Sequence, residues 1–138
     1  MPFVLDASIA VAWAFRDENH ANATLALERI RNDAAHVPGL WWYEVRNSLI
    51  VNERRRRLSE ADTAVFLQAI SRLDIAIDPL PDQARVRAIS RRHRLTVYDA
   101  VYLELAQREE IPLATLDTKL AHAAGSENVR LINEPHEV

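Results

Sequence analysis

Apolar and polar residues alternate along the chain in blocks that predict short buried strands separated by helices. Compact apolar runs, each closed by polar or helix-breaking residues, predict strands at 3–5, 36–39, 74–78, 111–117 and 128–132. Apolar residues at helical spacing predict helices at 8–15, 20–33, 41–57, 59–73, 82–93, 98–109 and 118–124. Strands and helices that alternate in this way predict an α/β fold with a mainly parallel sheet.

Composition narrows the class of protein. The 138 residues fit one domain, expected to span 1–138, and 49% of them are hydrophobic, which is enough for a core. The chain has only two glycines, which argues against an all-β protein rich in tight turns, and it has no cysteine for disulfides or thiolate metal sites. We find no apolar run of membrane-spanning length and no signal-peptide pattern, so we expect a soluble cytoplasmic protein.

Four acidic residues occupy positions that suggest a shared site. Asp6 and Asp117 end the first and fourth predicted strands, whereas Glu44 and Asp99 lie in the first turns of two predicted helices. Each alone has an ordinary explanation as a helix cap or a partner of the helix dipole. Sites in parallel sheets form beyond the carboxyl ends of the strands, and carboxylates crowded there repel one another. One or two divalent cations with a preference for oxygen ligands, Mg²⁺ or Mn²⁺, would relieve that repulsion.

Four motifs in fixed order carry a family resemblance: "VLDAS", "YEVRNSL", "YDAVYLELA" and "LATLDTKLAHAA". Together they resemble the PIN domain, and most closely the small VapC ribonuclease toxins of bacterial toxin–antitoxin pairs. The resemblance implies a PIN-like three-layer α/β/α sandwich with a mainly parallel five-stranded sheet. It also implies a Mg²⁺- or Mn²⁺-dependent endoribonuclease whose metal ligands and catalytic residues are Asp6, Glu44, Asp99 and Asp117.

The resemblance extends to neighbouring residues and to partners. Ser8, Asn47 and Thr115 match polar positions beside the acids, where they would orient a carboxylate or the substrate. Many relatives have a glycine where this chain has Glu110, so the resemblance does not extend to the local turn there. The resemblance further implies an RNA substrate, a homodimer and a small inhibitory antitoxin protein.

Other classes of protein fit the residues less well. The five histidines lack zinc-type spacing, and neither a glycine-rich phosphate loop nor a G-x-S-x-G elbow is present. A phosphatase that used Asp6 would call for an aspartate where Ser8 stands, and a phosphoryl-accepting receiver would leave Glu44 and Asp99 without a role. A non-catalytic PIN-like module that binds RNA or protein remains an alternative, although the presence of all four acids argues against it.

The formal charge of −3 does not itself indicate a nucleic-acid partner, but the arginines are clustered. If one helix continues to Arg57, Arg55 returns to within about 20° of the direction of Glu44 and lies roughly 16 Å along the same face. We therefore expect Arg55 to hold the RNA backbone, with Arg57 pointing elsewhere. The adjacent Trp41 and Trp42 face different sides of that helix, so we expect packing rather than a stacking platform for RNA.

Overall fold

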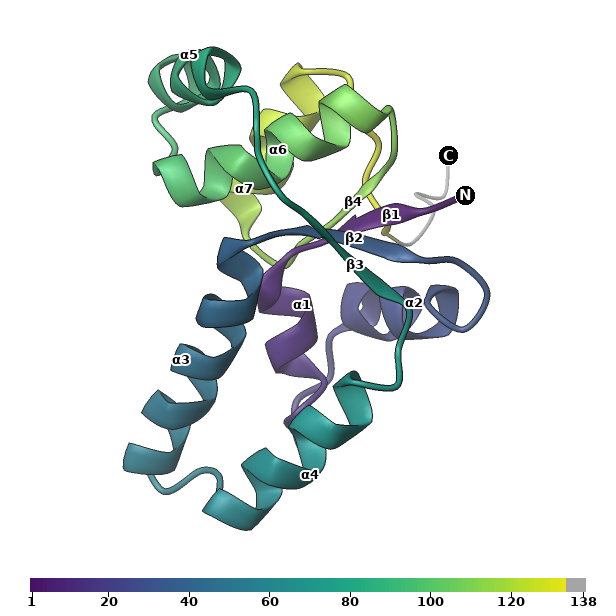
Figure 1. The fold of residues 1–138 in the computed structure, drawn as a ribbon, viewed down its shortest axis with the longest axis vertical. Coiled ribbons are helices and arrows are strands. Elements are labelled where there is room, and N and C mark those ends of the chain that lie inside the picture. Colours follow the sequence, from purple (N-terminus) through teal and green to yellow (C-terminus); the bar gives the residue numbers. More distant parts are fainter. Residues whose placement is uncertain (134–138) are drawn as a thin grey trace.

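A computed structural model describes residues 1–133, which fold into a parallel sheet covered on both faces by helices. The sheet has the strand order β3-β2-β1-β4, with β1 Phe3–Leu5, β2 Ala35–Pro38, β3 Ile75–Asp78 and β4 Leu113–Ala114. The helices are α1 Ala7–Ala12, α2 Ala21–Arg29, α3 Leu40–Arg54, α4 Glu60–Ile70, α5 Gln83–His93, α6 Val97–Glu109 and α7 Thr118–Ser126. Helices α1 to α4 lie on one side of the sheet and α5, α6 and α7 on the other (Figure 1). The predicted three-layer α/β/α architecture is confirmed.

The described part of the chain contains four strands rather than the expected five. The segment 128–132 contributes one parallel bridge, in which Leu131 faces Leu113. Two backbone hydrogen bonds hold it, from Leu113 N–H to the Arg130 carbonyl and from Ile132 N–H to the Leu113 carbonyl, each 2.9 Å long. The pairing is short because β4 contains only two residues, so a neighbouring segment has little edge on which to continue.

The two central elements, β1 and α6, are the most deeply buried. Phe3, Val4 and Leu5 have no solvent exposure, as expected of a central strand covered on both faces. Helix α6 is buried along most of its length, in agreement with its apolar pattern. Among residues 1–133, no helix combines the length and the apolar character needed to cross a bilayer.

Helix α3 ends three residues earlier than predicted, which corrects the expected boundary at Arg57. Arg56 adopts the left-handed conformation with φ 60°. The N–H groups of Arg56 and Arg57 then bond to the carbonyls of Glu53 and Asn52, both at 2.9 Å, in the pattern of a Schellman motif. The end of the helix could not be predicted from a glycine, because the left-handed position that usually holds glycine here holds arginine.

The aromatic residues at the start of α3 separate as expected. Trp41 is buried in the core with 3% of its surface exposed, whereas Trp42 and Tyr43 are 44% and 70% exposed. The Arg46 guanidinium lies over the Trp42 ring, 3.8 Å from its centroid. Trp41 and Trp42 therefore form no common platform, in agreement with the expectation of packing, and Trp41 packs in the core.

Candidate active site

Asp6 stands at the junction of β1 and α1, and its backbone and side chain have separate roles. Its N–H donates to the Ala114 carbonyl of β4 at 3.0 Å, which continues the sheet by one residue. Its side chain makes no helix-capping hydrogen bond. Instead, Oδ2 accepts from the hydroxyls of Ser8 and Thr115, both at 2.6 Å. Asp6 is buried, with 6% of its surface exposed, and its carboxylate lies between the ends of β1 and β4.

The turn after β4 is tied to the turn after β1. Leu116 N–H donates to Ser8 Oγ, and Asp117 N–H donates to Thr115 Oγ1, both at 3.0 Å. Asp117 caps α7 as predicted, because its Oδ1 accepts from Leu120 N–H at 2.9 Å. Two neighbouring strand ends thus hold Asp6 and Asp117 at the carboxyl edge of the sheet.

The other two acids come from helices on opposite faces of the sheet. Thr96 caps α6 by accepting from Asp99 N–H at 3.1 Å, which fixes Asp99 in the first turn. Glu44 lies in α3, and its Oε1 accepts a hydrogen bond of 2.6 Å from the Tyr102 hydroxyl of α6. This bond joins the two helices across the end of the sheet.

These four residues, Asp6, Glu44, Asp99 and Asp117, form what we call the acid cluster. Burial is the main cause that raises the pKa of Asp6, and the charges of Asp99 and Asp117 add to it. The pKa of Glu44 is likewise raised, first by burial and then by Asp6 and Asp99. Burial followed by the charge of Asp117 raises the pKa of Asp99. The charged forms of Asp6, Glu44 and Asp99 are therefore destabilised in part by neighbouring members of the acid cluster.

The donor chemistry of the acid cluster fits a hard divalent cation. All four members offer carboxylate oxygens, and within residues 1–133 none of them forms an ion pair with a lysine or arginine. No three Asp, Glu or His side chains in this part of the chain already stand together as a ligand set. The carboxylates of Asp6, Glu44 and Asp117 each accept a hydrogen bond from a neighbouring donor, so a cation would have to draw them together from these positions.

Of the residues predicted to support the acids, some contact the acid cluster in the structure and others do not. Ser8 and Thr115 both bind Asp6, which is the position expected for them. Asn47 is exposed on α3 and makes no hydrogen bond to the acid cluster within residues 1–133. Arg55 is exposed, and its N–H still donates to the Val51 carbonyl at 3.1 Å, so the helical direction shared with Glu44 persists to this residue.

Arg57 was expected only to point away from the face that carries Glu44, but in the structure it makes specific contacts. Its guanidinium lies 4.3 Å from the centroid of the Phe15 ring and donates to Glu18 at 3.2 Å. These contacts give it a structural role beyond the end of α3. The role of Arg55 in holding RNA stays a prediction.

Sequence reasoning missed two residues that organise the site, Tyr102 and Thr96. Tyr102 follows Asp99 by three positions, so both lie on one face of α6, and this spacing was the available signal. Thr96 precedes Asp99 by three positions, in the pattern of a helix start. Neither side chain is a carboxylate, so the pattern of acidic residues along the chain does not point to them.

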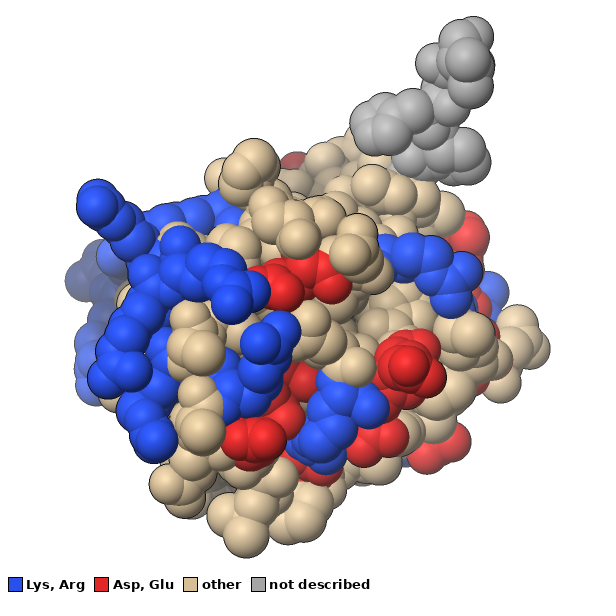
Figure 2. Space-filling view, turned by 90° about the horizontal axis from the view of Figure 1, so that it is seen from above, with Lys and Arg blue, Asp and Glu red and all other residues tan. Residues whose placement is uncertain are grey.

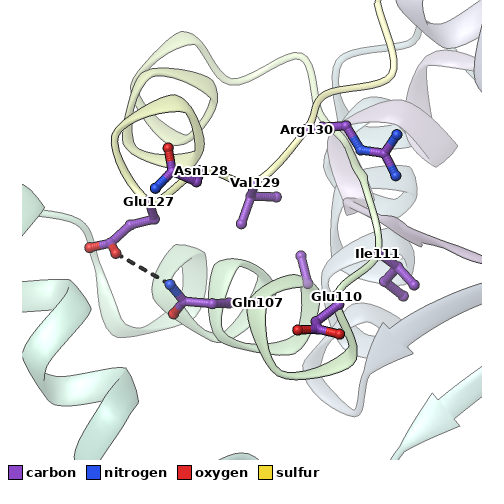
Figure 3. Close-up of a pocket in the computed structure, with 8 residues that line it drawn as sticks. Gln107, Glu110, Ile111, Glu127, Asn128, Val129 and Arg130 are labelled. Carbon is purple, nitrogen blue, oxygen red and sulfur yellow. Dashed lines mark hydrogen bonds between the residues drawn. The ribbon is translucent and has the colours of Figure 1, made fainter.

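Two cavities lie away from the acid cluster. A groove of about 760 Å³ is lined mainly by side chains of the α1–α2 segment and α4. A smaller pocket of about 310 Å³ lies between the end of α6 and the segment after α7, where Figure 3 shows Gln107 bonded to Glu127. His93 and Arg92 also bind Glu127 and lower its pKa to about 2. No member of the acid cluster lines either cavity.

Comparisons with known proteins agree on one family. A model of the PIN domain matches residues 3–126. The protein named Ribonuclease VapC3 of Pyrobaculum aerophilum is 32% identical over 125 residues, which cover 88% of this chain and 93% of the relative. VapC ribonuclease Mb0985 of Mycobacterium bovis is 34% identical over 118 residues, which cover 86% and 87% of the two chains.

Two solved structures share the fold. The crystal structure of PAE2754 from Pyrobaculum aerophilum has a TM-score of 0.69 at 23% identity, covering 89% of this chain and 84% of that chain. The crystal structure of FitAcB from Neisseria gonorrhoeae has a TM-score of 0.58 at 17% identity, covering 95% and 96%.

Proposed function

Because the chain belongs to the PIN-domain family, we propose that it is a metal-dependent endoribonuclease, with residues 1–138 forming a single PIN domain. One observation supports this proposal: four acids from both faces of the sheet lie near its carboxyl edge, where their charges influence one another, and none of them forms an ion pair with lysine or arginine among residues 1–133. The resemblance to VapC ribonucleases inferred from the four motifs is confirmed.

Asp6, Asp99 and Asp117 would hold a divalent cation, Mg²⁺ or Mn²⁺, and Glu44 would complete the ligand set or accept a proton from water. When bound, the metal would supply activation of water and stabilisation of charge on the phosphate oxygens. The hydroxyls of Ser8 and Thr115 both donate to Oδ2 of Asp6 and so fix the orientation of its carboxylate. Tyr102 does the same for Glu44.

The partners follow from the family. We propose that RNA is the substrate, that the enzyme forms a homodimer in the cytoplasm, and that a small antitoxin protein inhibits it. The support is the likeness to VapC ribonucleases over most of the chain. In this role the chain is the toxin of a toxin–antitoxin pair.

The direct test is cleavage of RNA by purified protein free of any antitoxin. We expect activity with Mg²⁺ or Mn²⁺, none in excess EDTA, and none in Asp99→Asn, whose carboxylate is replaced by an amide of the same size. The control is Asp74→Asn, a change of the same type in the segment before β3, at the amino edge of the sheet. Undiminished cleavage in excess chelator would exclude a metal-dependent mechanism.

The toxin role has its own test. We expect expression of the wild-type chain to arrest growth and expression of Asp99→Asn to leave growth unchanged. Co-expression of the cognate antitoxin should restore growth. Normal growth in cells that contain soluble, RNA-cleaving protein would contradict the toxin role and leave the ribonuclease proposal intact.

A further inference from the structure

Helix α5 carries basic residues on two different faces. Arg85 and Arg92 both bind Glu127, with nitrogen–oxygen distances of 3.3 Å and 2.8 Å. Arg87 and Arg91 lie about 200–240° around the helix from Arg85 and are exposed. Neither makes an ion pair or a side-chain hydrogen bond within residues 1–133. Figure 2 shows Lys and Arg side chains gathered on the side of the molecule where α5 lies.

The segment after α5 lies between these arginines and the acid cluster. Arg94 follows the helix in the left-handed conformation, with φ 53°, and its side chain is exposed. Its carbonyl accepts a hydrogen bond of 2.6 Å from Lys119 Nζ, at the start of α7. The positive charge of Lys119 also reaches Asp99, where it partly offsets the causes that raise the pKa of that carboxyl. Arg87, Arg91, Arg94 and Lys119 are all exposed and follow one another from α5 to the start of α7, and we call them the cationic strip.

Lys119 is the member of the cationic strip that helix electrostatics does not explain. Arg91 lies in the last turn of α5, where the helix dipole favours a positive charge. Lys119, the only lysine in the chain, lies in the first turn of α7, where the dipole disfavours it. One of its three N–H groups donates to Arg94, and within residues 1–133 the other two find no acceptor.

We propose that Lys119 binds a phosphate of the RNA beside the acid cluster, and that Arg94, Arg91 and Arg87 bind the phosphates that follow. This inference rests on the proposed ribonuclease function and assigns the path of its substrate. A phosphodiester is negatively charged and must approach the acid cluster, which is also negative. The two remaining N–H donors of Lys119 can bind the oxygens of such a phosphate and offset that repulsion. The exposed arginines of the cationic strip can bind the next phosphates of the RNA along α5.

The test measures binding of a fluorescein-labelled 20-nucleotide oligouridine to protein that carries Asp6→Asn, in EDTA, at several salt concentrations between about 50 and 200 mM. Adding Lys119→Gln, which keeps an N–H donor for Arg94 but removes the charge, should weaken binding about fivefold. The slope of log Kd against log salt should fall by about 0.7, the value for one phosphate contact on a single strand. Lys119→Arg should retain most of the affinity and the slope.

A matched control is Arg72→Gln. Arg72 is also an exposed arginine, but it precedes β3 and so lies at the amino edge of the sheet, opposite the site. It should change neither affinity nor slope, whereas Arg87→Gln and Arg91→Gln should each lower the slope. In the active protein, Lys119→Gln should raise KM with little change in kcat, because a phosphate contact of this kind is made equally in ground and transition states.

The outcomes separate this inference from the proposed function. Protein that cleaves RNA, but whose Lys119→Gln variant binds the oligouridine with unchanged affinity and slope, overturns the cationic strip alone. A fall in kcat and thermal stability with unchanged affinity assigns Lys119 a structural role and also overturns it. Protein that cleaves no RNA with Mg²⁺ or Mn²⁺ overturns the ribonuclease proposal itself.

Discussion

Replacing Tyr102 by phenylalanine is the most selective perturbation of the site. The Tyr102 side chain is fully buried, and its hydroxyl donates to Glu44 Oε1 at 2.6 Å. Phenylalanine keeps the ring and its packing in the core and deletes only this hydroxyl. Any change in the acid cluster therefore follows from the loss of one hydrogen bond that orients Glu44.

The expected magnitudes follow from the surroundings of the two side chains. Net contributions of hydrogen bonds to charged groups are about 1.5–3 kcal/mol. Glu44 is only partly buried and regains water, so we expect the lower end, about 1.5 kcal/mol, and a fall of about 5 °C in Tm. Loss of a partner that orients a metal ligand should weaken metal affinity by about 10- to 100-fold. The pKa of Glu44 should rise further, because the Tyr102 bond lowers it.

The assay is calorimetric titration of wild-type protein and Tyr102→Phe with Mn²⁺ and Mg²⁺, together with thermal unfolding in EDTA. Tyr98→Phe is the control, because Tyr98 lies on the same helix, is 64% exposed and makes no hydrogen bond within residues 1–133. If Tyr102→Phe binds the metals as tightly as the wild type, the Tyr102 hydrogen bond does not prepare Glu44 as part of the site, and our reasoning is refuted.

Two further predictions concern stability. The raised pKa of Asp6 means that its charged form opposes folding, so stability is lost as the pH rises through that pKa. Without metal at neutral pH, Asp6→Asn should therefore be at least as stable as the wild type. Mg²⁺ should stabilise only the wild type. A variant that is less stable than the wild type in urea unfolding would contradict this prediction. Glu110→Gly should stabilise the protein by about 0.5–1 kcal/mol, because Glu110 has φ 54°, a left-handed conformation that glycine adopts more easily. Glu109→Gly, within α6, should destabilise the protein by a similar amount. Equal effects of the two substitutions in urea unfolding would refute this prediction.

Much of the candidate site could be predicted because strand ends leave a local signal. A short apolar run followed by an acid places Asp6 at the end of β1 and Asp117 just after β4, and parallel strands bring their carboxyl ends to one edge. Asp99 sits in a helix's first turn, as its position before an apolar run indicated. These positions depend on a few neighbouring residues, so one sequence is sufficient to find them.

The rest depends on contacts between distant segments. The Tyr102–Glu44 bond joins residues 58 positions apart, and no local pattern selects that tyrosine from the others. Asn47 shares a helix with Glu44, yet whether it reaches the acids depends on how α3 packs, and it remains exposed. The end of α3 was misplaced because Arg56 occupies a left-handed position that glycine usually marks.

The same packing that makes Asp6 costly to charge also makes it useful. Its carboxylate is buried between the Ser8 and Thr115 hydroxyls, and the strand ends that carry them are hydrogen-bonded to each other. A surface aspartate would have an ordinary pKa and many rotamers, and a metal would have to order it at an entropic cost. In this chain folding has already fixed Asp6, and binding of a cation would release the repulsion left within the acid cluster. If the proposed function holds, metal affinity and a lower stability without metal are two consequences of one arrangement, so the stability of Asp6→Asn reports on the same interaction as metal titration of the wild type.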